Sequence, residues 1–115
     1  MTYEQVRKMA LELEGVEEGT SYGTAALKVE GKLFARLKED GVTLVLGTTF
    51  EERDGLMAEE GETYFLTDHY LNYPWVLVRL KRVKESALRE LVTRAWKLAR
   101  EKKSKNTKGG KRGKG

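Results

Sequence analysis

The chain has 115 residues, of which 39% are hydrophobic and 35% are charged, and its net charge is +4. These values predict one globular domain with a single modest core. No apolar run approaches the roughly 20 residues that span a bilayer, and the N-terminus lacks the apolar stretch of a secretory signal, so we expect a cytoplasmic protein without a membrane segment. The lack of cysteine excludes disulfides and thiolate metal sites, and a single histidine excludes a histidine-cluster metal centre.

Positive charge is concentrated at the C-terminal end. Residues 100–115 hold eight basic side chains and one acidic side chain, a net of +7, which leaves −3 of the total +4 for the rest of the chain. After residue 103 there is no apolar residue and there are four glycines. Such a segment cannot bury enough surface to offset the entropy of ordering. We therefore predict one domain over residues 1–102 and a disordered basic tail over 103–115.

The first half of the chain changes from helical periodicity to strand periodicity. Thr2 and Gln5 have the spacing of a capping box, and apolar residues then recur at helical intervals, which predicts an amphipathic first helix. The segment 17–24, "EEGTSYGT", is predicted as a loop. A period of two with glycine-containing turns then predicts an antiparallel meander. Its three strands are expected at about 25–30, 32–38 and 42–47.

The second half is expected to hold two further strands between two helices. These elements are a short helix at 48–59, a strand at 63–67, a loop at 68–74, a strand at 75–83, and a helix from 84 or 85 to 102. The order α-β-β-β-α-β-β-α predicts an α+β two-layer domain, in which an antiparallel sheet of about five strands carries helices on one face. The other face of the sheet is then expected to be open.

Strand alternation assigns side chains to the two sheet faces. The helix-covered face is predicted to hold Leu27, Val29, Leu33, Ala35, Leu37, Leu44 and Leu46. The open face is predicted to hold Ala26, Lys28, Phe34, Arg36, Thr43 and Val45, and from the last strand Trp75, Leu77, Arg79 and Lys81.

Three stretches together resemble the MmcQ/YjbR family of small bacterial proteins. They are "EEGTSYGTAALKVEGKLFARL", "YPWVLVRL" and "LRELVTRAWKLA", and the resemblance covers about residues 2–100. It implies a frataxin-like (CyaY-like) α+β fold, in agreement with the order of elements above. Members of this family are often labelled DNA-binding proteins, so the resemblance also implies DNA or RNA as a partner. The tail after residue 103 lies outside it.

A nucleic-acid interface is the first functional hypothesis. On the open face, basic groups could neutralise phosphates while an exposed aromatic ring stacks on a base. The candidate residues there are Lys28, Lys32, Phe34, Arg36, Arg79 and Lys81. The tail would add salt-dependent, sequence-independent contacts through Lys103, Lys105, Lys108, Lys111 and Arg112. A solvated sheet face and a tail without a dedicated partner are the alternatives.

A ligand cleft is the second hypothesis. It would form if the loop around Tyr22 met the segment 68–75, "DHYLNYPW". Aromatic side chains with polar ends suit half-buried positions that line a pocket or close a core edge. The candidate lining residues are Tyr22, His69, Tyr70, Tyr73 and Trp75. A small-molecule or protein-interaction module would show a cleft there, whereas a structural corner would be packed shut; a monomer and a homodimer are both compatible with the sequence.

Catalysis finds little support in the residue pattern. His69 follows Asp68, and Thr20 and Ser21 carry hydroxyls, but adjacent residues on an extended chain point in different directions. Consecutive acids on helices do not converge as hard cations require. We therefore expect a protein that is not an enzyme and that has no metal or cofactor.

Overall fold

The computed structural model describes the backbone of residues 1–112 and the side chains of residues 1–101. The elements are α1 (Tyr3–Leu11), β1 (Val16–Ser21), β2 (Thr24–Val29), β3 (Lys32–Leu37), β4 (Thr43–Gly47), α2 (Phe50–Glu59), β5 (Tyr64–Phe65), the 3-10 helix η1 (Asp68–Tyr70), β6 (Trp75–Arg79) and α3 (Glu85–Arg112). The bounds of α3 extend past the predicted helix end at residue 102. The predicted tail over 103–115 lies outside the side chains that the structure describes, so its disorder stays a prediction.

The α+β fold class is confirmed. The strands form one antiparallel sheet in the order β1-β2-β3-β4-β6-β5. The prediction of a loop at 17–24 is wrong, because β1 adds a sixth strand that pairs with β2 from Val16↔Val29 to Ser21↔Thr24. This edge strand is mostly exposed, so its sequence lacks the apolar alternation that reveals a half-buried strand.

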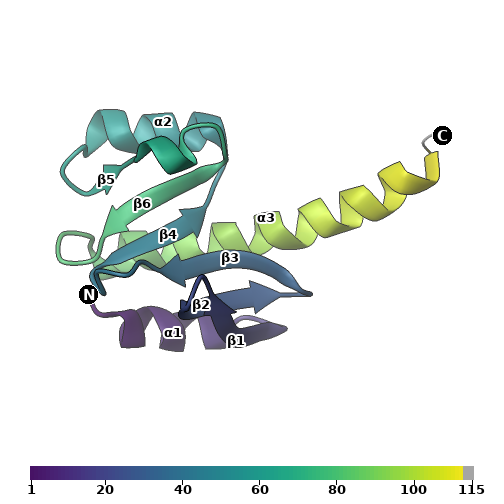
Figure 1. Cartoon of the computed structure of the whole chain (residues 1–115), viewed down its shortest axis with the longest axis horizontal. Coiled ribbons are helices and arrows are strands. Elements are labelled where there is room, and N and C mark those ends of the chain that lie inside the picture. The colour runs from purple at the N-terminus through teal and green to yellow at the C-terminus, as the bar shows by residue number, and fades with distance from the viewer. Residues whose placement is uncertain (113–115) are drawn as a thin grey trace.

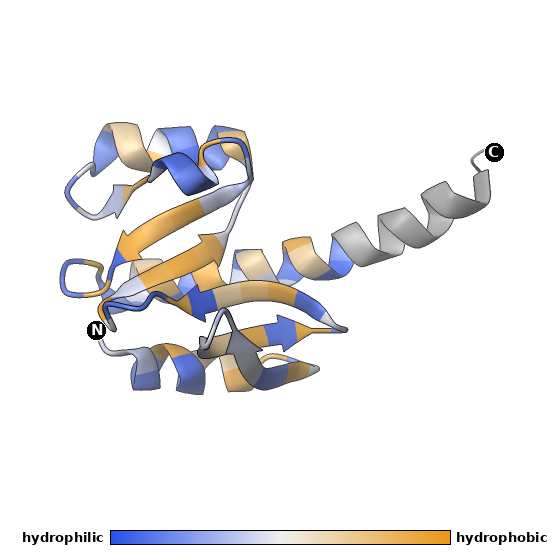
Figure 2. Ribbon diagram, viewed as in Figure 1, coloured by the Kyte–Doolittle hydropathy of each residue, from blue (hydrophilic) through white to orange (hydrophobic). Residues whose placement is uncertain are grey.

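The helices α1 and α3 cover one face of the sheet. Figure 1 shows α3 crossing behind β3 and β4, with α1 beside it and α2 near β5 and β6. The capping box predicted at Thr2 and Gln5 is present at the start of α1. Apolar residues line the strands in Figure 2, and those facing α3 form the main core. Fully buried members include Leu27, Leu44 and Leu88.

A β-bulge reverses the predicted faces of two residues in β3. Leu27 pairs with Ala35 but Lys28 pairs with Leu33, so Phe34 is an extra residue in β3. The prediction that Phe34 lies exposed on the open face is therefore wrong: it is buried in the main core. Leu33, predicted for the core, is only half-buried and lies on the opposite face.

The second face of the sheet is not fully open. The segment 66–74 lies over β4 and β6, where Tyr70 packs with Val45 and Leu77 in a separate small core. Val45 and Leu77 are buried as completely as residues under the helices. The prediction of an open face is wrong over this half, because the segment 66–74, which includes η1, supplies the apolar cover through Tyr70. A hollow is left beside it, over β3.

Candidate functional site

A cleft of about 300 Å³ lies between the tip of the β1–β2 hairpin and the segment 68–75. Its lining residues are Tyr22, Leu33, Arg36, Val45, His69, Tyr70, Tyr73 and Trp75. All five residues of the predicted aromatic cleft are among them. The structure thus brings together two loops that are about fifty residues apart, and leaves space between them.

The hairpin tip presents Tyr22 in a strained backbone conformation. Tyr22 and Gly23 form a two-residue turn between the paired residues Ser21 and Thr24, with φ values of 54° and 79°. Positive φ at both positions is the pattern of a type I′ turn, which favours Asn or Gly at the first position. A tyrosine there costs about 1 kcal/mol or more. Its side chain is nevertheless 76% exposed, so core packing does not account for its presence.

A buried arginine of α2 holds the opposite wall of the cleft. The guanidinium of Arg53 donates hydrogen bonds of 2.7 to 3.4 Å to backbone carbonyls of the loop. The accepting residues are Tyr70, Leu71, Tyr73 and Trp75. A single side chain therefore fixes the course of an otherwise irregular segment, because a planar guanidinium offers five donors in a rigid fork.

A second buried arginine forms part of the floor. Arg36 of β3 donates a hydrogen bond of 2.9 Å to the hydroxyl of Tyr70 and another of 2.9 Å to the carboxylate of Glu39. Its side chain is only 5% exposed. The Nε of Arg36 is buried and has no hydrogen-bond partner among the described residues. The ring of Tyr22 lies over the guanidinium, with its centroid 5.1 Å from Cζ.

The aromatic side chains of the cleft differ in how much of each is accessible. Tyr73 is 57% exposed, and His69 is exposed with its ring edge-to-face against Tyr70 at 4.7 Å. Trp75 is half-buried. Several π-faces and one cation therefore border a small hollow, an arrangement suited to holding a flat, mainly apolar molecule with one polar end.

Two of the residues predicted for a nucleic-acid interface are buried. Phe34 is in the core and Arg36 is in the cleft floor. Arg79 is exposed, but its guanidinium donates to the backbone of Glu62 and lies 4.0 Å from the centre of the Phe65 ring. The remaining predicted lysines of the body, Lys28, Lys32 and Lys81, lie respectively in β2, at the start of β3 and in the turn after β6. The tail candidates Lys103, Lys105, Lys108, Lys111 and Arg112 lie outside the described side chains.

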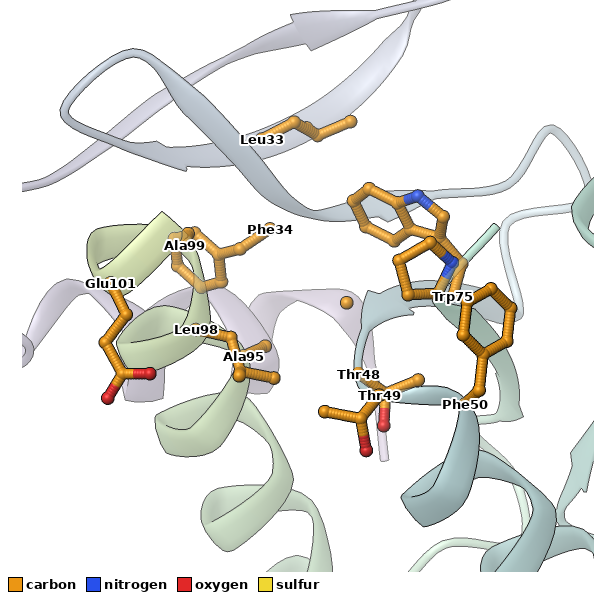
Figure 3. Close-up of a pocket in the computed structure, with 12 residues that line it drawn as sticks. Leu33, Phe34, Thr48, Thr49, Phe50, Trp75, Ala95, Leu98, Ala99 and Glu101 are labelled. Carbon is orange, nitrogen blue, oxygen red and sulfur yellow. The ribbon is translucent and has the colours of Figure 1, made fainter. Parts of the chain in front are cut away.

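A second cavity, of about 340 Å³, lies on the helix side of the sheet between α3 and the start of α2. Figure 3 shows Phe34, Trp75 and Phe50 around it, and Leu33 and Trp75 line both this cavity and the first cleft. Its threonines already serve the fold: Thr49 caps α2 and the Thr48 hydroxyl bonds to Glu52. The lining is otherwise mainly apolar and contains no basic side chain, so this cavity lacks the convergent polar groups that orient a ligand.

Groups for metal binding do not converge in the described part of the chain. His69 makes no hydrogen bond to Asp68 there, and its ring contact is with Tyr70. Among the described residues, no three metal-ligating side chains lie together, and no helix is both long and apolar enough to cross a bilayer.

Sequence reasoning placed Arg36 on this face of the sheet but in a nucleic-acid interface, and it missed Leu33 and Val45 as cleft residues. The bulge that turns Leu33 outward leaves no mark in the pattern of β3. The pairing of Arg36 with Val45 across β3 and β4 was the available signal, because cross-strand partners share a face.

Comparisons with known proteins give a consistent family relationship. The sequence model of the YjbR family matches residues 11–98. Uncharacterized proteins of Mycobacterium bovis and Mycobacterium tuberculosis are 49% identical over 41 residues, which are 36% of this chain and 32% of theirs. The chain thus matches only about a third of the length of these relatives. A crystal structure of a Deinococcus radiodurans protein with a DUF419 domain is similar with a TM-score of 0.75 at 23% identity, over 84% of this chain and 77% of that one. This last likeness concerns the fold alone.

Proposed function

The chain belongs to the YjbR family, and we propose that it is a binding protein, not an enzyme, that holds a small flat aromatic ligand in the outer cleft. One observation supports this most: Tyr22 lines the cleft with most of its ring exposed, on a turn whose backbone disfavours tyrosine. Strain of this kind persists where the surrounding structure imposes it and is common at ligand sites.

The size of the cleft limits the ligand. About 300 Å³ is the lower end of the range for small-molecule pockets. A single ring or a fused pair of rings fits this volume, whereas an extended cofactor does not. Stacking on Tyr22 and Tyr73 would supply most of the contact area, because both rings are largely exposed.

The polar groups around the cleft support binding rather than catalysis. Arg36 and Tyr70 are hydrogen-bonded to each other, and Arg36 is permanently charged, so neither is placed to exchange a proton. In the described residues, the ring of His69 contacts Tyr70 and is not hydrogen-bonded to a serine or threonine hydroxyl that it could activate. These groups can orient a ligand without transforming it.

Nucleic-acid binding is a second candidate, and one observation favours it: the net charge of +7 over residues 100–115. A basic segment attracts DNA or RNA through phosphate neutralisation, independently of sequence. The sheet face adds little support, because Phe34 and Arg36 are buried. This candidate therefore concerns the tail rather than the cleft.

Titration of the full chain with indole, followed by NMR of the ¹⁵N-labelled protein, tests the proposed function. We expect weak, saturable shifts confined to the backbone amides around Tyr22, His69 and Tyr73, which line this cleft and not the second cavity. A Tyr73→Ser variant should bind indole several-fold more weakly, because it removes one of the two exposed stacking faces.

The matched control is Leu11→Ser. Leu11 is also an exposed apolar residue, at 39%, but it lies at the end of α1 and lines neither of the two cavities. Its substitution should leave indole affinity unchanged. Non-saturable shifts, or shifts centred on Phe50, would contradict the proposal, because the aromatic cleft would then have no special affinity for flat rings.

A further inference from the structure

Arg36 carries a charge that the interior of the protein does not balance. Its guanidinium is almost fully buried, and its Tyr70 partner is neutral. The carboxylate that neutralises it, Glu39, has a side chain that is 63% exposed. A buried charge is costly unless it is paired and hydrogen-bonded. This cation therefore depends on an anion that comes from the solvent side.

We propose that the ligand of the cleft is an aromatic carboxylate, whose acid group pairs with Arg36 in place of Glu39. The inference rests on the proposed function, since it names the charged end of the ligand that the aromatic walls would hold. Arginine suits this role because its planar fork matches the two oxygens of a carboxylate.

The position of Glu39 allows its carboxylate to move away from Arg36 when a ligand carboxylate binds. Glu39 follows the end of β3, and its neighbours Lys38 and Asp40 are also at the surface of the β3–β4 turn. The pKa of Glu39 lies below its usual range because of a hydrogen bond from its own backbone N–H and the positive charges of Arg36 and Lys38. The side chain is thus ionised at neutral pH, and rotating it into water costs little, because it is already mostly solvated.

The charge of the lining agrees with an anionic ligand. Among the cleft residues, all of which the structure describes, Arg36 is the one permanently charged side chain and none is acidic. The Nε of Arg36 is buried and has no hydrogen-bond partner among the described residues, so the guanidinium keeps one donor for an oxygen that reaches it. A cationic ligand would find no anion in this lining.

A matched series of probes isolates the charge. Indole, indole-3-acetate and tryptamine share one ring system and are neutral, anionic and cationic at neutral pH. We expect indole-3-acetate to bind best and tryptamine worst, with a shift of the Arg36 Nε–H signal only for indole-3-acetate. A Glu39→Gln variant should bind indole-3-acetate about threefold to tenfold more tightly, because the competing carboxylate is gone, and should bind indole as the parent does.

Glu62→Gln is the control for net charge. Glu62 is an exposed acid that forms an ion pair with Arg82 and not with Arg36. Its substitution should therefore not change the affinity for any of the three probes. The carboxylate inference is overturned if indole binds but indole-3-acetate binds no better, or if Glu39→Gln does not change the affinity for indole-3-acetate. The proposed binding of aromatic ligands in the cleft would remain in both cases. If none of the probes binds, both the proposed function and the inference are wrong.

Discussion

Among single residues, Tyr22 and Glu30 occupy turns of the same backbone geometry, but only Tyr22 lines the cleft. Glu30 has a φ of 52° and precedes Gly31, just as Tyr22 has a φ of 54° and precedes Gly23. Both positions favour Asn or Gly. Glu30 lies outside the cleft, whereas Tyr22 lines it with a largely exposed ring. A comparison of Tyr22 with Glu30 can therefore distinguish the effect of backbone strain from the effect of ligand contact.

Replacing each of these residues by asparagine tests this separation. Glu30→Asn should stabilise the protein by somewhat less than about 1 kcal/mol, because asparagine tolerates the left-handed region but the exposed ion pair of Glu30 with Arg100 is lost. Tyr22→Asn should gain about 0.5 kcal/mol less, since it also loses the contact between its ring and Arg36. Urea denaturation of both variants gives these free energies of unfolding.

The two variants should differ more in their affinity for indole than in their free energy of unfolding. Tyr22→Asn is expected to weaken indole affinity several-fold, and Glu30→Asn is expected to leave it unchanged. Equal affinities in the two variants would show that the ring of Tyr22 does not contribute to the cleft.

At the scale of elements, the site depends on how an irregular segment is held. The segment 66–74 contains only the short η1, yet it covers one half of a sheet face. Its course depends on Arg53, whose helix α2 contacts β5 and β6. On the other side of the cleft, the bulge in β3 sends Phe34 to the core and Leu33 to the cleft. An arginine and one extra strand residue thus shape the hollow.

Substitution of Arg53 tests its role in holding the loop. Arg53→Met keeps the apolar stem but leaves several loop carbonyls without donors, so we expect a loss of about 2 to 3 kcal/mol in the free energy of unfolding. Hydrogen exchange of the amides in segment 66–74 should accelerate more than that of β2 and β3, and indole affinity should fall.

The control for this prediction is Arg82→Met. Arg82 is an exposed arginine in an ion pair with Glu62, and its loss should cost less than about 0.5 kcal/mol. Uniform acceleration of exchange across the sheet in Arg53→Met would show that this arginine supports the whole fold and not the loop in particular.

At the scale of the whole molecule, two candidate activities are separate. The cleft belongs to the sheet face, between elements far apart in sequence. The largest concentration of positive charge belongs to residues 100–115, while the rest of the chain has a net charge of −3. A protein whose body is mildly acidic would bind nucleic acid mainly through that end.

Deletion of residues 103–115 should therefore abolish most DNA binding at low salt and leave indole affinity unchanged. A salt titration of the parent protein should show a steep loss of DNA affinity that the truncated protein lacks. Fluorescence anisotropy of labelled DNA measures both. Tyr22→Asn is the converse control, because it should weaken indole binding and leave DNA affinity intact. Undiminished DNA binding by the truncated chain would move this activity to the body.

Patterns along the chain predicted the fold class, the capping of α1, the positions of most strands and the asymmetry of charge. These properties are local, because periodicity, capping residues and composition depend on neighbours along the chain. The aromatic residues of the cleft were also visible in the sequence, since Tyr22 and the segment 68–75 stand out from their surroundings. Whether these residues form a cleft depended on whether the turn at Tyr22 and the segment 68–75 lie next to each other in the fold.

That meeting depends on the tertiary structure, and so do the faces that Leu33 and Phe34 occupy. The bulge at Phe34 shifts the alternation by one residue, and β1 pairs at an exposed edge where no apolar pattern is needed. Arg36 was visible in the sequence as a basic residue, but its burial under Tyr22 follows from pairing between distant strands and loops. Contacts between segments far apart in sequence leave no periodic signal, and the cleft is made of such contacts.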